Sequence, residues 1–257
     1  MLAACAARAD EVHVAVAANF AGPMAKIGVA FSAATGHTLK VSSGATGKFY
    51  SQIVAGAPFE VLLAADDETP RRLIAEGHAV AGTNFSYALG KLVLWSARPD
   101  FVDDQGAVLA SDRIAHVAIA NPKVAPYGAA ALEVIRARGL ADVVGPKLVT
   151  AESIAQAYQF AFTGNAQVAF VAWSQVIGAA APRADEQPGR QPKAAVGRAP
   201  LRGSYWLVPP ALYGEIRQDA VLLQAGRGRA AAAAFLAFLK SDAATRVIRD
   251  QGYGAVQ

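Results

Sequence analysis

Short apolar runs alternate with amphipathic stretches along most of the chain. In the first third, the apolar runs predict buried strands at residues 12–17, 37–41 and 60–64. The stretches that follow them have helical spacing and predict helices at residues 23–35, 48–55 and 69–76. Strands that are apolar on both faces and alternate with helices are typical of a parallel sheet covered on both sides.

The same rhythm resumes near Leu89 and predicts a second block of α/β structure. Its strands are expected at residues 91–95, 117–120, 147–149, 167–171 and 205–208, and its helices at residues 128–138 and 154–162. Two Ala-rich helices, expected at residues 227–241 and 243–251, end the chain and are able to return to the first block. The pattern therefore predicts an α/β protein with two blocks in tandem.

The N-terminal residues MLAACAARAD have the composition of a clipped export signal. The ARA triplet at residues 7–9 is an A-x-A pattern of the kind that signal peptidases cut, and LAAC at residues 2–5 resembles a lipoprotein cleavage box. The plainer alternative is an ordinary Ala-rich start. If the export interpretation holds, residues 1–9 are a remnant of the signal, and the protein is periplasmic or lipid-anchored through Cys5.

The composition fits a folded protein and gives little support to nucleic acid or metal binding. Hydrophobic residues make up 54% of the 257 residues and charged residues 17%, so a large core is expected. The net charge is +4, and the Lys and Arg residues are scattered; the densest basic stretch, residues 183–202, is predicted as a solvated loop. The four histidines stand apart and Cys5 is the one cysteine, so no bare metal-ion site is expected.

The stretch SSGATGKFYSQI at residues 42–53 has the small residues of an anion-binding turn before a helix. It does not fit the nucleotide-binding P-loop, because Ser42 stands at the first glycine position and Phe49 at the magnesium-binding hydroxyl position. No Ser, His and Asp are placed by a hydrolase motif either. The acids at residues 66–68 are interpreted as a helix N-cap rather than a catalytic pair. The chain is therefore not expected to be an enzyme.

Four turns between a predicted strand and a predicted helix share one property. Asn19, Thr46, Tyr127 and Ile154 lie at the start of a helix, where backbone N–H groups have no partner within the helix. Each turn alone is explained by helix capping. Together, at the carboxyl ends of strands in two blocks, they suggest a cleft ringed by helix N-termini, which suits a compact oxyanion.

At this point several segments match a known family. They are AVAANF (15–20), SSGATGKFYSQI (42–53), GAPFEVLLAAD (56–66), NPKVAPYGAAA (121–131), TGNAQVAFVAWS (163–174) and LYGEIRQDAVLL (212–223). The chain resembles the periplasmic molybdate-binding proteins of ABC importers, and the resemblance extends from Val12 to the C-terminus. It implies an α/β, two-lobed type II periplasmic binding fold, each lobe a mostly parallel sheet flanked by helices, with a cleft between the lobes.

The resemblance also implies a set of anion ligands. Asn19 is expected to give a side-chain and a backbone donor, with Ala18 helping through its position. Thr46 stands where the family commonly has serine, so its hydroxyl is expected to bind the anion. Tyr127 is expected to donate through its hydroxyl and backbone N–H, and Ile154 through its backbone N–H.

One family ligand has no counterpart in this chain. Some relatives have a tyrosine ligand in the strand near Val171, and this chain has Ala172 there. The resemblance therefore places the chain with the relatives that instead use an asparagine and a tyrosine at the positions of Asn19 and Tyr127.

The resemblance implies a domain arrangement and partners as well. Lobe I is expected to comprise residues 10–88 and 205–257, and lobe II residues 89–204, with a hinge motion that closes on the ligand. The closed monomer is expected to present molybdate or tungstate to the membrane permease of an ABC transporter. No cofactor and no nucleic acid are expected.

Three alternatives to molybdate binding remain open at the level of sequence. A receptor for sulfate or another tetrahedral oxyanion would use the same donors, because sulfate has the same charge and shape but is smaller. An α/β enzyme acting on a phosphate-containing substrate would use Lys48. An effector-sensing domain of a regulator is disfavoured, because no DNA-binding helix-turn-helix segment is recognised.

Overall fold

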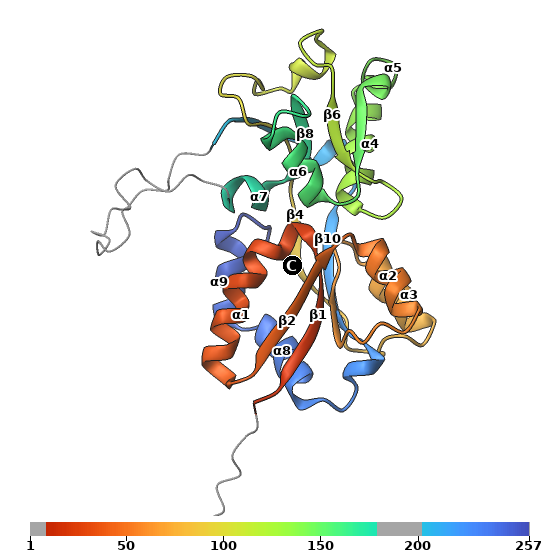
Figure 1. Cartoon of the computed structure of the whole chain (residues 1–257), viewed down its shortest axis with the longest axis vertical. Coiled ribbons are helices and arrows are strands. Elements are labelled where there is room, and N and C mark those ends of the chain that lie inside the picture. Colours follow the sequence, from red (N-terminus) through yellow and green to blue (C-terminus); the bar gives the residue numbers. More distant parts are fainter. Residues whose placement is uncertain (1–8, 179–201, 257) are drawn as a thin grey trace, which may run out of the picture. The chain divides into compact units, whose positions relative to one another are not determined.

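The computed structural model describes residues 9–178 and 202–256 (Figure 1). The proposed export-signal remnant, including Cys5, lies outside these residues except for Ala9, and so does nearly all of the predicted basic loop at residues 183–202. Within the described residues, no helix combines the length and apolar character that a membrane span requires. The chain divides into two compact units, which comprise Met1–Gly90, Val124–Pro126 and Glu215–Gln257 in unit 1 and Lys91–Lys123 and Tyr127–Gly214 in unit 2.

Unit 1 is built on a five-stranded sheet with the order β2-β1-β3-β10-β4. The strands are β1 (Glu11–Ala17), β2 (Thr38–Gly44), β3 (Val61–Leu63), β4 (Phe85–Gly90) and β10 (Ile216–Leu222). β1 pairs in parallel with β2 and β3, whereas β10 pairs antiparallel with β3 and β4. Its helices are α1 (Ala21–Thr35), α2 (Thr46–Val54), α3 (Glu68–Ala75), α8 (Ala230–Leu239) and α9 (Asp242–Asp250).

The alternation of side chains along β1 divides the core of unit 1 into two layers. Val12, Val14 and Val16 pack with buried residues of α1, α8 and α9 on one face of the sheet. Ala15 packs with Phe49 of α2 and with α3 residues on the other face. Figure 1 shows the same division, with α1 and α9 on one side of the sheet and α2 and α3 on the other. Burial on both faces is the reason β1 is a near-continuous apolar run.

Unit 2 repeats this plan with the order β7-β6-β8-β5-β9. The strands are β5 (Leu92–Ser96), β6 (Val117–Ala120), β7 (Leu148–Ala151), β8 (Val168–Ala172) and β9 (Ser204–Leu207). β6 pairs in parallel with β7 and β8, and β5 pairs antiparallel with β8 and β9. Its helices are α4 (Pro126–Ala137), α5 (Ala141–Val144), α6 (Ile154–Phe162) and α7 (Trp173–Gly178).

Five short 3-10 helices complete the regular structure of the described residues. They are η1 (Ala18–Phe20), η2 (Ala107–Ala110), η3 (Gly145–Lys147), η4 (Pro210–Leu212) and η5 (Gln224–Gly226). Only η1 lies at one of the turns that the sequence singled out. It connects β1 directly to α1.

The predicted α/β class with two sheets is confirmed, but two details of the prediction differ from the structure. Each sheet is mixed rather than mostly parallel, because β10 in unit 1 and β5 in unit 2 run against their neighbours. The two boundaries between the units also differ from the predicted ones. The first, predicted at 88/89, lies after Gly90, where β4 ends. The second, predicted at 204/205, lies after Gly214, because β9 pairs with β5 inside unit 2.

Candidate functional site

Asn19 lies in η1, immediately after the carboxyl end of β1, and only 2% of its surface is exposed. Its side-chain nitrogen donates to Oε1 of Gln218 (3.0 Å) and to the hydroxyl of Tyr253 (2.9 Å). A side-chain amide nitrogen carries two protons, so both have acceptors inside unit 1. These two bonds hold the side chain of Asn19 against β10 and the C-terminal segment. Ala18 precedes Asn19 at the start of η1 and is also buried.

Thr46 is the first residue of α2 and is 1% exposed. The backbone N–H of Ala65, just after β3, donates to Oγ1 of Thr46 at 3.0 Å. A hydroxyl has one proton and two lone pairs, so this bond occupies a lone pair and leaves the proton for donation. Among the described residues, no acceptor for that proton is found. Thr46 is therefore a buried donor at a helix N-terminus.

Gly47, the next residue of α2, has a separate role in the motif. Its backbone N–H donates to the carbonyl of Val124 (2.9 Å), and a Cβ at Gly47 would lie 2.9 Å from Cα of Val124. The glycine is therefore required for close approach of this backbone segment.

Tyr127 is the second residue of α4 and is 2% exposed. Gly128 follows it, and a Cβ there would overlap the carbonyl oxygen of Ala120, the last residue of β6. The first turn of α4 therefore packs on the end of β6 at a distance that only glycine permits. This packing fixes where Tyr127 lies.

Ile154 is the first residue of α6 and is 4% exposed. Ser153 caps the helix, since its side chain accepts a bond from the N–H of Gln156 (3.3 Å). The carbonyl of Ile154 accepts from the side chain of Gln175 (3.2 Å). The backbone N–H of a first helical residue has no acceptor within its helix. Ile154 thus places a buried backbone N–H at the start of α6.

The predicted residues occupy equivalent places in the two units. Asn19 and Thr46 follow β1 and β2, which are parallel neighbours in unit 1. Tyr127 and Ile154 follow β6 and β7, which are parallel neighbours in unit 2. The carboxyl ends of parallel neighbours meet at one edge of a sheet, so each unit brings its own pair together. None of the four positions is an Asp or Glu.

A buried polar cluster behind Asn19 was not predicted. Gln218 is fully buried in β10. The hydroxyl of Tyr87 lies 3.1 Å from Oε1 of Gln218 and 3.0 Å from the carbonyl oxygen of Ala64, and these two acceptors share its one proton. Gln218 pairs with Ala88 and Asp219 with Ser86, so Tyr87 is an extra residue in β4, a β-bulge. Burial raises the pKa of Tyr87 well above its usual range, so its hydroxyl stays protonated and able to donate.

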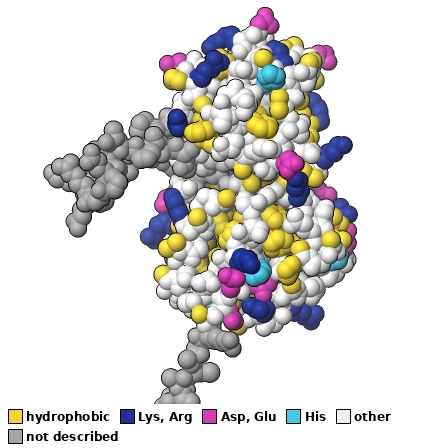
Figure 2. Space-filling model, viewed as in Figure 1, with side chains coloured by type: hydrophobic (Ala, Val, Ile, Leu, Met, Phe, Trp, Pro, Cys, Tyr) yellow, Lys and Arg dark blue, Asp and Glu magenta, His cyan; other side chains and the backbone are white. Residues whose placement is uncertain are grey.

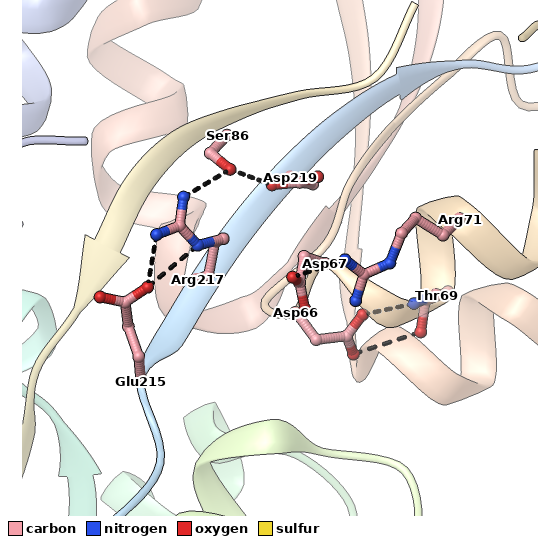
Figure 3. A network of polar contacts seen from close by, with 8 residues as sticks. All are labelled: Asp66, Asp67, Thr69, Arg71, Ser86, Glu215, Arg217 and Asp219. Atoms are coloured by element: carbon pink, nitrogen blue, oxygen red, sulfur yellow. Dashed lines mark hydrogen bonds and ion pairs between the residues drawn. The ribbon is translucent and has the colours of Figure 1, made fainter. Parts of the chain in front are cut away.

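Charged groups next to this cluster are paired within unit 1 (Figure 3). The hydroxyl of Ser86 donates to Asp219 (2.6 Å), and Arg217 pairs with Glu215 (2.7 Å). Asp66 accepts from the N–H of Thr69 (2.8 Å) in the first turn of α3, whereas the side chain of Asp67, the N-cap residue, makes no capping bond. Burial raises the pKa of Asp66; the hydrogen bonds from Thr69 oppose this shift, and the neighbouring acids add to it.

The charged surface agrees with the scattered charges of the sequence. On the face shown in Figure 2, Lys and Arg side chains are dispersed and alternate with Asp and Glu. Among residues 9–178 and 202–256, no group of three His, Cys, Asp or Glu side chains is placed to hold a metal ion. What the sites offer is hydrogen-bond donors from helix N-termini.

The comparisons with known proteins agree with this arrangement. The family model for bacterial extracellular solute-binding proteins matches residues 12–254. The molybdate-binding protein ModA of Azotobacter vinelandii is 53% identical over 253 residues, covering 98% of this chain and 93% of that protein. ModA of Rhodobacter capsulatus is 53% identical over 247 residues, covering 96% and 89%.

A solved structure gives the same result. The periplasmic molybdate-binding protein of Azotobacter vinelandii superimposes with a TM-score of 0.86 at 38% identity, covering 96% of this chain and 100% of that one. The resemblance seen in the sequence motifs is thereby confirmed. The chain belongs to the family of bacterial extracellular solute-binding proteins.

Proposed function

We propose that this protein binds molybdate outside the cytoplasm and delivers it to the membrane permease of an ABC importer. The observation that carries the proposal is that four strand-to-helix turns, at Asn19, Thr46, Tyr127 and Ile154, carry no carboxylate at these positions, in a chain 53% identical to two molybdate-binding proteins. Binding and delivery require no covalent chemistry, so the protein acts as a carrier and not as an enzyme.

The chemistry of the ligand matches the chemistry of these turns. Molybdate is a tetrahedral dianion without a proton at neutral pH, so each of its oxygens accepts hydrogen bonds and none donates. Backbone N–H groups at helix N-termini and hydroxyl protons stabilise such an anion, and they add no formal positive charge. A carboxylate at one of the four positions would repel it. Phosphate differs because it carries a proton at neutral pH, for which an acidic acceptor is useful.

The proposal assigns a donor to each of the predicted residues. Thr46 donates through its hydroxyl. The N–H of Ala65 occupies one lone pair of Oγ1, which leaves the hydroxyl proton for the anion. Ala18 and Asn19 act through the backbone of η1, because the side-chain protons of Asn19 are engaged with Gln218 and Tyr253. Tyr127 and Ile154 of unit 2 donate through the tyrosine hydroxyl and the first N–H of α6.

The proposal extends to tungstate, which has the same charge and shape as molybdate. Sulfate is the second candidate ligand, since its charge and geometry suit the same donors and only its smaller size distinguishes it. The periplasm is the proposed location, in keeping with an extracellular solute-binding family. A monomer without a cofactor suffices for this role.

Titration calorimetry of the full chain with molybdate, tungstate, sulfate and phosphate tests the proposal. Tight binding of the first two anions is expected, together with weak or undetectable binding of sulfate and phosphate. Equal affinities for sulfate and molybdate would assign the protein to general oxyanion transport, and the molybdate proposal would then be abandoned.

A further inference from the structure

The C-terminal segment contacts the turn that holds Asn19. The hydroxyl of Tyr253 accepts a hydrogen bond from the side chain of Asn19 (2.9 Å) and donates one to the backbone carbonyl of the same residue (2.9 Å). The two residues are 234 positions apart in the sequence. One hydroxyl therefore binds both the side chain and the backbone of Asn19.

Ring packing reinforces this contact at the next residue. The ring of Phe20 is fully buried and meets the rings of Tyr87 and Tyr253 edge-on, with centroid distances of 4.8 and 5.3 Å. The same two tyrosines belong to the hydrogen-bonded cluster around Gln218 and Asn19. The three residues of η1 are thus held by polar contacts at Asn19 and by aromatic contacts at Phe20.

Tyr253 is itself held by the sheet of unit 1. Gly254 and Leu89 of β4 exchange two backbone hydrogen bonds, of 2.8 and 3.2 Å. The chain before Tyr253 is the C-terminal end of α9, which packs on α1. The hydroxyl of Tyr253 is therefore fixed relative to the sheet, and through it the backbone of η1 is fixed as well.

We propose that Tyr253 is a positioning residue of the oxyanion site, and that its bonds to Asn19 fix the η1 backbone at the spacing that selects molybdate over smaller anions. The inference rests on the proposed function. Sulfate and molybdate share charge and shape, so discrimination between them depends on donor positions held within about 0.5 Å. A buried polar cluster whose members are all bonded supplies that rigidity.

The variant Tyr253→Phe tests the inference by calorimetry on the full chain. It removes the hydroxyl and keeps the ring that packs on Phe20. Molybdate affinity is expected to fall about tenfold, the scale of one buried hydrogen bond. Sulfate affinity should fall less or rise, so that the ratio of the two affinities narrows. The matched control is Tyr213→Phe, which removes a half-buried hydroxyl bonded to the N–H of Leu92 in unit 2 and should leave the ratio unchanged.

The outcomes separate the inference from the function on which it rests. If the unchanged protein does not bind molybdate, the proposed function fails. If it binds molybdate and Tyr253→Phe retains both the affinity and the ratio, only the positioning role fails. If Tyr253→Phe lowers the affinities for molybdate and sulfate equally and also lowers the melting temperature, Tyr253 has a general structural role. That result would also overturn the inference.

A measurement on the unchanged protein covers the case in which Tyr253→Phe does not fold. Hydrogen exchange is followed with and without molybdate at the amides of Leu89 and Gly254, which pair with each other and are not residues of η1. Slower exchange of both amides with molybdate is expected, because the anion and Tyr253 stabilise the same backbone. Unchanged exchange at these amides, with slower exchange at residues 18–20, would overturn the inference.

Discussion

The backbone N–H of Ala65 donates a 3.0 Å hydrogen bond to Oγ1 of Thr46. This bond joins the end of β3 to the start of α2 and determines what the threonine hydroxyl is able to do. One lone pair of Oγ1 accepts from this fixed backbone N–H, so the hydroxyl proton of Thr46 points in a different direction. Thr46 was chosen from the sequence as a hydroxyl at the start of a helix. The N–H that orients this hydroxyl as a donor belongs to Ala65, which follows β3.

Replacing Thr46 by valine should weaken molybdate binding by about 1.5–3 kcal/mol, the usual contribution of a hydrogen bond to a charged group. Valine keeps the shape of threonine and removes the hydroxyl. Thr46→Ser is the matched control, because serine keeps both the bond from Ala65 and the proton for the anion. Calorimetry measures both variants. Equal affinities of the valine and serine variants would exclude the hydroxyl as a ligand.

Replacing Ile154 by proline should remove one donor and leave α6 in place. Proline lacks an N–H, and the first helical position tolerates it because that N–H has no partner in the helix. Ser153 has φ −150° and ψ 167°, which suits a residue before proline. We expect affinity to fall by about 1.5–3 kcal/mol. Ile154→Val, which keeps the N–H, should bind nearly as well as the unchanged protein; similar losses in both variants would contradict a backbone contact.

Replacing Gly128 by alanine should lower both stability and molybdate affinity. The new Cβ would overlap the carbonyl oxygen of Ala120, so the first turn of α4 must shift and carry Tyr127 with it. Overpacking of this kind typically costs about 1–3 kcal/mol of unfolding free energy. Gly145→Ala is the control, because no atom lies within 4 Å of its Cβ and its φ is −48°. Thermal unfolding and calorimetry compare the two variants, and equal behaviour would refute the packing argument.

The pH dependence of stability should carry a contribution from Asp66. Burial raises the pKa of this carboxyl in the folded protein above its value in the unfolded chain. The folded state therefore binds more protons between the two pKa values, and stability falls as pH rises from the ordinary aspartate pKa through the raised one. Asp66→Asn keeps an oxygen to accept from the N–H of Thr69 and removes the titration. Unfolding temperatures from pH 3 to 8 should fall less steeply in this variant; an identical slope would contradict the assignment.

The elements that could be predicted from sequence are those whose signal is local. α6 begins and ends at the predicted residues, because a serine cap precedes it and apolar positions recur along it. β6 was also predicted residue for residue, since all four of its positions are buried. The four candidate turns followed from the same local pattern, because each lies between such a strand and such a helix.

The missed elements depend on contacts between distant parts of the chain. β10 contains the polar residues Arg217, Gln218 and Asp219 in succession, so it does not read as an apolar strand. The buried side chains of Gln218 and Asp219 have hydrogen-bond partners far away in the sequence, namely Asn19, Tyr87 and Ser86. β4 was missed because its bulge at Tyr87 interrupts the alternation of a strand. One available signal was the alternation of Ile216 and Gln218 with Ala220 and Leu222 on one side of the IRQDAVL stretch, since a polar side chain on a buried side implies a partner. Another was an aromatic residue isolated between glycines at Tyr253.

The position of β10 in the sheet of unit 1 affects how the chain is made. In that sheet, β3 and β4 are joined only through β10, which lies more than 120 residues after β4 in the sequence. A ribosome therefore releases β1, β2 and β3 long before the strand that completes their sheet. Until then the apolar strand β3 has an open edge of the kind that pairs with other chains. Delayed exposure to a folding compartment, as in post-translational secretion, would protect this sheet from aggregation.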